Sequence, residues 1–457
     1  MTPDRARHIS FVDGGSYPLR GGNLLRPLID GTPAFRRIAG AVEQARRSVW
    51  LTVTFYAHDF AIPDRGVSLF DLLDRATERG LDVRVIFWRP NTESSGYGRT
   101  FAGSAADHDF LRERASRFRI RWDRARGPYC HHQKIWLVDA GRPSEVAFVG
   151  GINLTAMALG SPGHRDGWRH DAHLELAGPS SSDVHHNFVQ RWNEASERSS
   201  DDGTWGHTGG DELPFPTRVS EPRGSSLVQV QRTIDRDRYR DNTPTPAGAA
   251  YDIASGEQTI LEQYCRAIET ARSSIYIENQ AIPIPEIATP IERALVRGVA
   301  VVMLVPAEPE EHVQAARRNP ARKPHFDALA RLGSHPNFTL AGIASLNSVG
   351  KRQNIYVHGK LMLVDDGWAT IGSCNLHAYS LQGHSELNAS FWDPSLVRAL
   401  RCELLAEHLD IDCSGVDGPA ALALYQRVAR DNGQKQASGE RDWQGLAFAL
   451  DAATYGE

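Results

Sequence analysis

The amino-acid sequence predicts an α/β protein made of two similar α-β-α lobes that are related by internal duplication. The pattern H-x-K-x-x-x-x-D occurs twice, from His132 to Asp139 and from His358 to Asp365. Each copy has the same place in a repeated order of helical and strand patterns. Strands that alternate with helices indicate layers of helices packed on a mixed sheet.

The repeated units follow one another in the same order in both halves. A helical pattern followed by a strand spans residues 34–55 in the first half and residues 260–280 in the second. A second such unit spans residues 69–87 and is matched by residues 291–305. The motif strands come next, and each half ends in a helical pattern, at residues 183–197 and 396–408. The repeat therefore predicts two lobes with equivalent strands.

Composition changes mark the expected boundaries of these lobes. We expect an N-terminal lobe at residues 1–198, a linker at 199–226, a C-terminal lobe at 227–413 and a helical extension at 414–457. The linker is rich in Gly, Pro and Ser, which interrupt regular structure. Residues 235–255 form a further irregular stretch that is too long for an ordinary connection, and it is either a functional loop or a plain surface loop.

The spacing within each motif has a direct physical consequence. Alternate side chains of a strand share a face, so His132 and Lys134 point one way while Ile135 points into the core. His358 and Lys360 repeat this arrangement. Two imidazoles and two ammonium groups around one cavity call for an anion, and a phosphate group is the natural candidate.

These motifs and their flanking sequences resemble the phospholipase D superfamily, and within it the eukaryotic-type subgroup. The similar segments in the first half are His131–Asp139, Ala147–Asn153, His170–His173, Gly178–Pro179 and Phe188–Glu194, and those in the second half are Ile275–Gln280, Tyr356–Asp366 and His384–Leu387. The resemblance implies the phospholipase D fold, in which the two motifs meet in one active site at the interface of the lobes. It also suggests that residues 159–168 and 235–255 border the mouth of that site, with plain surface loops as the alternative.

The resemblance also implies roles for the motif residues in cleaving a phosphodiester. His132 is expected to attack phosphorus and form a phosphohistidine, while His358 serves as general acid and then as general base. The internal symmetry leaves the reverse assignment open. Lys134 and Lys360 are expected to hold the non-bridging oxygens, together with the side-chain amides of Asn153 and Asn375 as hydrogen-bond donors.

Four carboxylates complete the predicted set. Asp171 and Glu386 stand where the family places the acids that orient its histidines, and a carboxylate is the best acceptor for the second imidazole nitrogen. Asp139 and Asp365 lie on the opposite strand parity from the histidines. We therefore expect them to be structural and to anchor a turn. This chemistry needs no cofactor and no metal ion, and the five scattered cysteines indicate neither a disulfide framework nor a zinc site.

The leading functional prediction is a phospholipase D that hydrolyses phospholipids such as phosphatidylcholine to phosphatidic acid and a headgroup. Transfer to alcohols is also expected, because a phosphohistidine accepts any hydroxyl. The alternatives are a phosphatidyltransferase of the cardiolipin synthase type and, less favoured, a nuclease of the same superfamily. A net charge of −5 argues against nucleic acid as a partner.

The expected partners are a phospholipid at a membrane surface and water or an alcohol as acceptor, with the protein acting as a monomer. No apolar run approaches the roughly 18–20 residues of a membrane span, and the first residues lack the apolar segment of a signal peptide. We expect a cytoplasmic protein with peripheral membrane contact. Trp168 and Tyr239 are candidates for exposed aromatic side chains that enter the headgroup layer.

Overall fold

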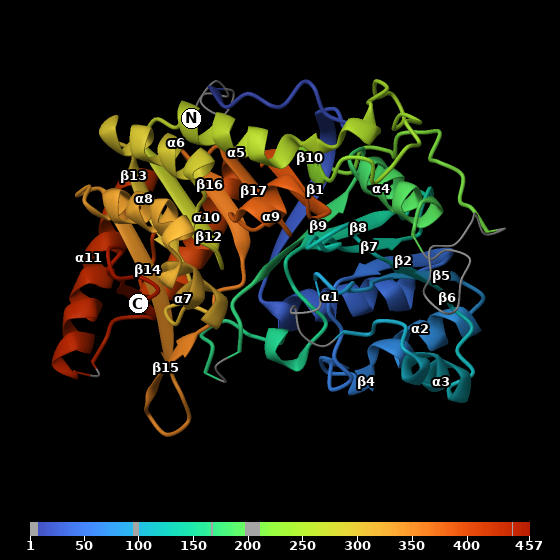
Figure 1. Cartoon of the computed structure of the whole chain (residues 1–457), viewed down its shortest axis with the longest axis horizontal. Helices are drawn as coiled ribbons and strands as arrows, with labels where there is room; N and C mark the ends of the chain where they lie inside the picture. The colour runs from blue at the N-terminus through green and yellow to red at the C-terminus, as the bar shows by residue number, and fades with distance from the viewer. Residues whose placement is uncertain (1–7, 95–99, 166–167, 197–210, 441) are drawn as a thin grey trace.

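The computed structural model describes residues 8–94, 100–165, 168–196, 211–440 and 442–457. Two lobes lie side by side, each with helices on both faces of a mixed sheet (Figure 1). The α-β-α architecture and the internal duplication are therefore as predicted from the repeat.

The N-terminal lobe contains one large sheet. Its elements are β1 (Arg20–Ile29), α1 (Gly31–Gln44), β2 (Ser48–Val53), α2 (Leu69–Glu78), β5 (Asp82–Trp88), α3 (Ala105–Glu113), β6 (Arg119–Asp123), β7 (Lys134–Val138), β8 (Val146–Gly150), β9 (Ala172–Ala177) and α4 (Ser181–Asn193), with a small ribbon of β3 (Ala61–Ile62) and β4 (Val67–Ser68). The strands of the sheet are ordered β6-β5-β2-β7-β8-β9-β1. Strands β2, β5 and β6 are parallel, and the motif strand β7 joins them antiparallel to β2.

The C-terminal lobe repeats this order. Its main elements are β10 (Ser226–Ile234), α5 (Thr259–Thr270), β12 (Ser274–Asn279), α6 (Pro285–Val296), β13 (Ala300–Leu304), α7 (Glu311–Arg318), α8 (Lys323–Gly333), β14 (Phe338–Leu346), β15 (Arg352–Ile355), β16 (Lys360–Val364), β17 (Trp368–Gly372), α9 (Ala378–Gln382), β18 (Glu386–Trp392) and α10 (Pro394–Leu409). The strand order is β14-β13-β12-β16-β17-β18-β10. Motif strand β16 thus occupies the place that β7 has in the first lobe.

Strand β1 joins the two sheets. It pairs with β9 along Leu24–Ile29 and, at its other end, with β10 through Arg20 and Asn23. A central apolar core then spans both lobes and contains Ile135 of β7 and Leu361 of β16. The expectation that the apolar residues of the motif strands enter the core is confirmed. Backbone pairing and shared core both hold the lobes in register.

The helices cover the outer faces because their apolar residues recur at helical spacing. In the N-terminal lobe α1 and α2 bury Phe35, Ile38 and Leu73 against the sheet, and α4 packs on its other face. In the C-terminal lobe α5, α6 and α8 form the outer layer and α10 the inner one. Local signals fix several helix starts, such as the capping box of Ser68 at α2 and the Asp393 cap of α10.

The segments near the two ends of the chain pack into the C-terminal lobe more closely than the predicted domain boundaries imply. Residues 8–17 belong in space to the C-terminal lobe, where the Nε1 group of Trp392 donates to the Ile9 carbonyl. The predicted C-terminal extension contains α11 (Gly418–Ser438) and also β19 (Ala447–Ala449), which pairs with β14. Of the predicted linker, residues 199–210 lie outside the described residues, and residues 211–225 run without regular structure to β10.

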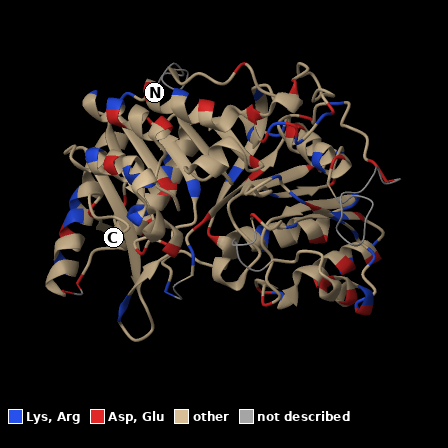
Figure 2. Ribbon diagram, viewed as in Figure 1, with Lys and Arg blue, Asp and Glu red and all other residues tan. Residues whose placement is uncertain are grey.

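Charged residues of both signs are interspersed over the helices and loops in the view of Figure 2, while few of them lie on the strands. Within the described part of the chain, no helix combines the length and apolar character that a membrane crossing requires.

Candidate active site

The two motif histidines lie where the lobes meet, and each is fixed by the backbone of the other lobe. The His132 amide donates a hydrogen bond to the Ser385 carbonyl at 2.9 Å, and the His358 amide donates to the His170 carbonyl at 2.7 Å. Both imidazoles precede their strands and are nearly enclosed, with exposed fractions of 6% and 5%. The structure therefore brings the two predicted histidines to one interface.

Each imidazole is paired with a carboxylate from the opposite lobe. His132 Nδ1 lies 3.0 Å from both carboxylate oxygens of Glu386, and His358 Nδ1 lies 2.5 Å from Asp171 Oδ2. A carboxylate accepts only, so each Nδ1 carries the shared proton and each Nε2 remains for chemistry. The predicted orienting acids thus contact the predicted histidines, and they do so crosswise.

The two lysines lie beside the histidines in equivalent positions. Lys134 Nζ donates to the His132 carbonyl at 2.7 Å, and Lys360 Nζ donates to the His358 carbonyl. Lys360 also contacts Gln280 Oε1 at 2.8 Å. Both ammonium groups are buried without a carboxylate in direct contact among the described residues. Charge without a paired anion suits a site that receives an anionic group.

Small residues are required next to the two asparagines. A Cβ on Gly150 would lie 2.4 Å from the Ala172 carbonyl oxygen, and one on Gly372 would lie 2.1 Å from Asn388 Oδ1. The chain can turn closely past the neighbouring strand only with glycine there. Asn153 and Asn375 follow these turns and are buried, and their Oδ1 atoms accept no hydrogen bond within the described structure.

The electrostatics of the site favour neutral imidazoles and make positive charge costly. Burial lowers the pKa of His132 and His358 well below the usual value, and the neighbouring lysines act in the same direction. Burial also lowers the pKa of Lys134 to about 8 and of Lys360 to about 7. Desolvation has the opposite effect on the carboxylates and raises the pKa of Glu386. An anionic phosphodiester would supply the missing counter-charge.

The motif aspartates lie at the far ends of the motif strands from the lysines. Asp139 accepts hydrogen bonds from the backbone amides of Arg46 and Arg47 in the turn between α1 and β2. Asp365 accepts equivalent bonds from Arg272 and Ser273 between α5 and β12. This geometry supports the structural role proposed for both aspartates.

Several contacts of the site were not assigned from the sequence. The Ser373 hydroxyl donates to Glu386 at 2.5 Å, and the Ser373 carbonyl lies 3.0 Å from His132 Nδ1. His131, His173 and His384 are also buried. His384 lies beside His132, with ring centroids 6.0 Å apart. Ser373 lies two residues before the predicted Asn375, and this proximity was the available signal for it.

The irregular stretch at residues 235–255 packs against the first motif through Arg238. Its guanidinium contacts Asp123 and lies 3.2 Å from His131 Nε2. The expectation that Tyr239 is an exposed aromatic is wrong, since this side chain is only 1% exposed and stacks against the Arg238 guanidinium. Trp168 is half-buried.

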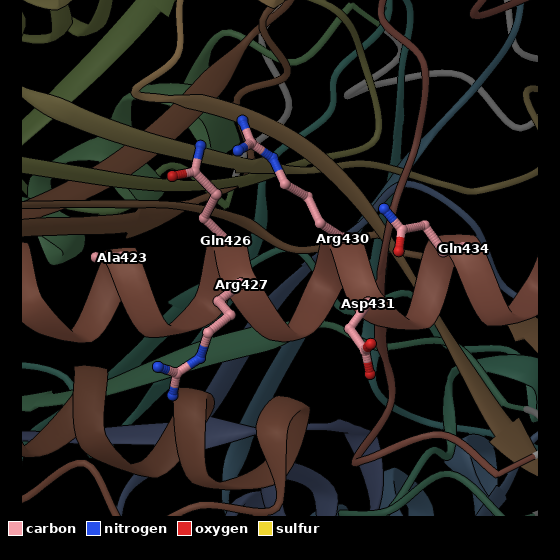
Figure 3. A pocket seen from close by; sticks show the side chains of 6 residues that line it. All are labelled: Ala423, Gln426, Arg427, Arg430, Asp431 and Gln434. Carbon is pink, nitrogen blue, oxygen red and sulfur yellow. The ribbon is translucent and has the colours of Figure 1, made fainter.

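Surface hollows occur elsewhere on the molecule and are separate from the histidines. One lies along the outer side of α11, where Gln426, Arg427 and Arg430 project from the helix (Figure 3). Another lies beside β15 and Trp443. Neither is lined by a residue of the motifs.

Comparison with known protein families shows to which family the chain belongs. A family model described as "Cardiolipin synthase, PLD-like domain" matches residues 38–192 and 264–407, and one described as "Phospholipase D" matches residues 156–283. The chain belongs to the phospholipase D superfamily. The first match covers the two halves separately, so each lobe is one phospholipase D repeat.

Cardiolipin synthases and a plant phospholipase D are among the superfamily members similar to this chain. Cardiolipin synthase A of Pseudomonas putida (strain W619) is 26% identical over 82% of this chain and 66% of its own length. Phospholipase D gamma 1 of Arabidopsis thaliana is 24% identical over 92% of this chain and 66% of its own length. The chain thus spans about two thirds of the length of these curated relatives. The phosphatidylserine synthase structure from Haemophilus influenzae Rd KW20 has a TM-score of 0.57, 12% identity and coverage of 96% and 99% of the two chains, which confirms the phospholipase D fold.

Proposed function

We propose that this protein is a phosphatidyltransferase of the cardiolipin synthase type, which moves a phosphatidyl group from one alcohol to another through a phosphohistidine. The observation that carries the proposal is the crosswise pairing of two buried imidazoles with two carboxylates beside two lysines. The family description and the relatives named cardiolipin synthase support transfer over the hydrolysis that the sequence alone favoured.

In the first step, His132 Nε2 attacks the phosphorus of the donor lipid. Its pKa is lowered by burial, so the attacking nitrogen holds a lone pair at neutral pH. A P–N bond forms as the P–O bond to the leaving alcohol breaks, and protonated His358 gives its Nε2 proton to that oxygen. The bound phosphodiester anion favours the protonated form of His358, whose pKa is low when no counter-charge is present.

In the second step, His358 takes the proton of the acceptor hydroxyl. The acceptor oxygen attacks phosphorus, the P–N bond breaks, and His132 is restored as a neutral imidazole. Lys134 and Lys360 stabilise the charge on the non-bridging oxygens in both transition states, and preorganised charge in a buried site does this most effectively. Glu386 and Asp171 hold the imidazoles in the productive tautomer.

Hydrolysis is the second candidate, supported by the similarity to a plant phospholipase D. It uses the same residues with water as acceptor. Near enclosure of both imidazoles supports transfer, because a deep site lets a bound alcohol compete with water for the intermediate.

The test uses vesicles of phosphatidylglycerol, of phosphatidylcholine and of an equal mixture, together with a single-stranded oligonucleotide. Wild type is compared with His132→Ala, His358→Ala and the control His185→Ala, which removes a buried histidine that pairs with Glu145 at 3.1 Å. Products are separated by mass spectrometry of the extracted lipids.

We expect cardiolipin and free glycerol from phosphatidylglycerol, in wild type and in the control alone. Phosphatidic acid as the main product would favour the phospholipase D alternative. Cleavage of the oligonucleotide with intact lipids would overturn a lipid substrate altogether. Activity that survives in His132→Ala would contradict the proposed mechanism.

A further inference from the structure

A second group of buried polar side chains lies at the lobe interface, outside the active site. It consists of Asp30 at the start of α1, His164 and His170 in the segment before β9, and Glu407 in α10. The first three are at most 1% exposed, and the Glu407 side chain is 10% exposed. Three of the four belong to the N-terminal lobe and the fourth to the C-terminal lobe, so the group spans the interface.

The donor atoms of these residues lie close enough together to hold one metal ion. His164 Nε2 lies 3.2 Å from His170 Nδ1, 3.2 Å from Asp30 Oδ2 and 3.5 Å from Glu407 Oε1. His170 Nδ1 lies 3.0 Å from Asp30 Oδ1. A zinc ion with ligands at roughly 2.0–2.1 Å in a tetrahedron separates its ligand atoms by about 3.3 Å. The printed separations are close to that value, and the ligand atoms of all four residues lie within 4.8 Å of one another.

Each imidazole has an acceptor close to its outer nitrogen. His164 Nδ1 lies 3.1 Å from the Trp168 carbonyl oxygen, and a carbonyl can only accept, so Nδ1 carries the proton. His170 Nε2 lies 3.1 Å from Glu278 Oε2, and Glu278 in turn accepts from the Tyr276 hydroxyl at 2.7 Å. The inner nitrogens, His164 Nε2 and His170 Nδ1, face one another and the Asp30 carboxylate. This outer arrangement is the one that metal-ligating histidines adopt.

A buried oxygen of the group also lacks a hydrogen bond. Asp30 is fully buried, and its Oδ2 atom accepts no hydrogen bond from the described residues although it points at His164 Nε2. Burying a carboxylate oxygen without compensation is costly. Two imidazole nitrogens and two carboxylates converge at this spacing, and a cation between them would offset the cost of burying the carboxylates.

We propose that Asp30, His164, His170 and Glu407 form a structural site for a divalent transition-metal ion, with zinc the preferred occupant. Two imidazoles and two carboxylates suit zinc, and four protein ligands leave no open coordination position, as in sites that stabilise a fold. The Gly163 amide donates to Glu407 Oε1 at 2.8 Å and orients this ligand.

The position of this site links it to the catalytic geometry. His170 immediately precedes Asp171, and its carbonyl accepts hydrogen bonds from the amides of His358 and Gly359. An ion on His170 would fix the segment that carries the acid for His358. It would also tie α10 of one lobe to α1 of the other. The metal site is therefore a positioning device that does not contact substrate.

The test measures metal bound to the full chain. Wild type, His164→Ala, Glu407→Gln and the control His185→Ala are dialysed against a weak chelator, and zinc per chain is determined by plasma mass spectrometry. Zinc affinity follows from competition with a chromophoric chelator, and a cobalt(II)-substituted sample is examined for the visible absorption of tetrahedral cobalt. Circular dichroism verifies folding of each variant.

We expect wild type and His185→Ala to retain about one zinc ion per chain and to show the tetrahedral cobalt spectrum. Both ligand variants should bind zinc more than about tenfold more weakly. Glu407→Gln removes only the least buried ligand, so its folding is expected to survive. Absence of zinc, cobalt, manganese and iron binding by wild type would overturn the proposal in favour of protons shared within the cluster, as would unchanged affinity in folded Glu407→Gln.

Discussion

Asp171 and His358 belong to opposite lobes, yet the carboxylate Oδ2 of the first lies 2.5 Å from the imidazole Nδ1 of the second. Glu386 and His132 form the reciprocal contact at 3.0 Å. Each histidine thus receives its orienting acid from the other repeat. Neither lobe alone contains a complete pair, and the duplicated halves depend on one another for catalysis.

If His358 protonates the leaving alcohol, the cost of losing its acid depends on the leaving group. We expect Asp171→Asn to slow transfer from phosphatidylglycerol by about two orders of magnitude, because an asparagine cannot stabilise the imidazolium. Transfer from phosphatidyl-p-nitrophenol should fall far less, since p-nitrophenolate leaves without a proton. The measurement is the initial rate of the first turnover with each donor.

Glu386→Gln provides the matched comparison, because it changes the acid of the proposed nucleophile. Its losses should be similar for the two donors. A pattern in which Glu386→Gln is rescued by the good leaving group, and Asp171→Asn is not, would mean that the two histidines have exchanged roles.

A covalent intermediate should accumulate when the second step is blocked. In His358→Ala, phosphatidyl-p-nitrophenol can still react with His132, but no general base remains to activate the acceptor. We expect release of p-nitrophenol to stop after one equivalent, with the phosphatidyl group on the peptide that contains His132. Mass spectrometry after proteolysis at alkaline pH locates it, because phosphohistidine is labile in acid. A label on any other peptide would exclude this assignment.

The buried lysines predict a pH dependence of stability. Burial lowers the pKa of Lys134 to about 8 and of Lys360 to about 7, against about 10.4 in the unfolded chain. Between these values the unfolded chain binds more protons, so the unliganded protein gains stability as pH rises from about 7 to 10. Anion binding favours the ammonium forms and reverses this trend.

Sulfate, which stays doubly charged over this range, is the probe. We expect it to raise the melting temperature clearly near pH 6 and only slightly near pH 9, relative to chloride at equal ionic strength. Lys360→Met should lose most of the effect at the lower pH. Equal stabilisation at both pH values would show that sulfate acts elsewhere on the protein.

The motif aspartates should matter for stability and not for chemistry. Asp139 is buried and accepts bonds from the amides of Arg46 and Arg47. Asp139→Ala leaves these donors unpaired, and we expect the free energy of unfolding to fall by about 1–3 kcal/mol. The transfer rate per folded molecule should remain that of wild type. Denaturant unfolding and active-site titration check the two halves of this prediction, and a loss of rate in the folded fraction would contradict it.

Much of the fold could be predicted from the sequence because it repeats. The order of helices and strands in each half follows from local periodicity, and the equivalent motif strands β7 and β16 fix the correspondence between lobes. Strand β1 has no such signal. Its buried and exposed residues do not alternate regularly, because one part of it pairs within its own lobe and the other part with β10.

The sequence was sufficient to predict which residues form the site, but not which carboxylate contacts which histidine. Histidine, lysine and the orienting acids carry recognisable spacing, but only the tertiary structure determines that Asp171 meets His358 across 187 positions of the chain. The burial of Tyr239 likewise could not be predicted from its neighbours in the sequence. A tyrosine in a polar stretch is expected to be exposed. In the structure its ring packs against the Arg238 guanidinium, which is held by the distant Asp123.

Strand β1 sets a limit on how a lipid can reach the histidines. Since its backbone is hydrogen-bonded to β9 of one lobe and β10 of the other, hinge opening between the lobes would require breaking sheet ladders and parting a common apolar core. The two lobes therefore behave as one rigid body. Lipid entry and product exit must therefore rely on displacement of side chains and connecting segments around the site. Turnover should be insensitive to a covalent cross-link placed between the two sheets.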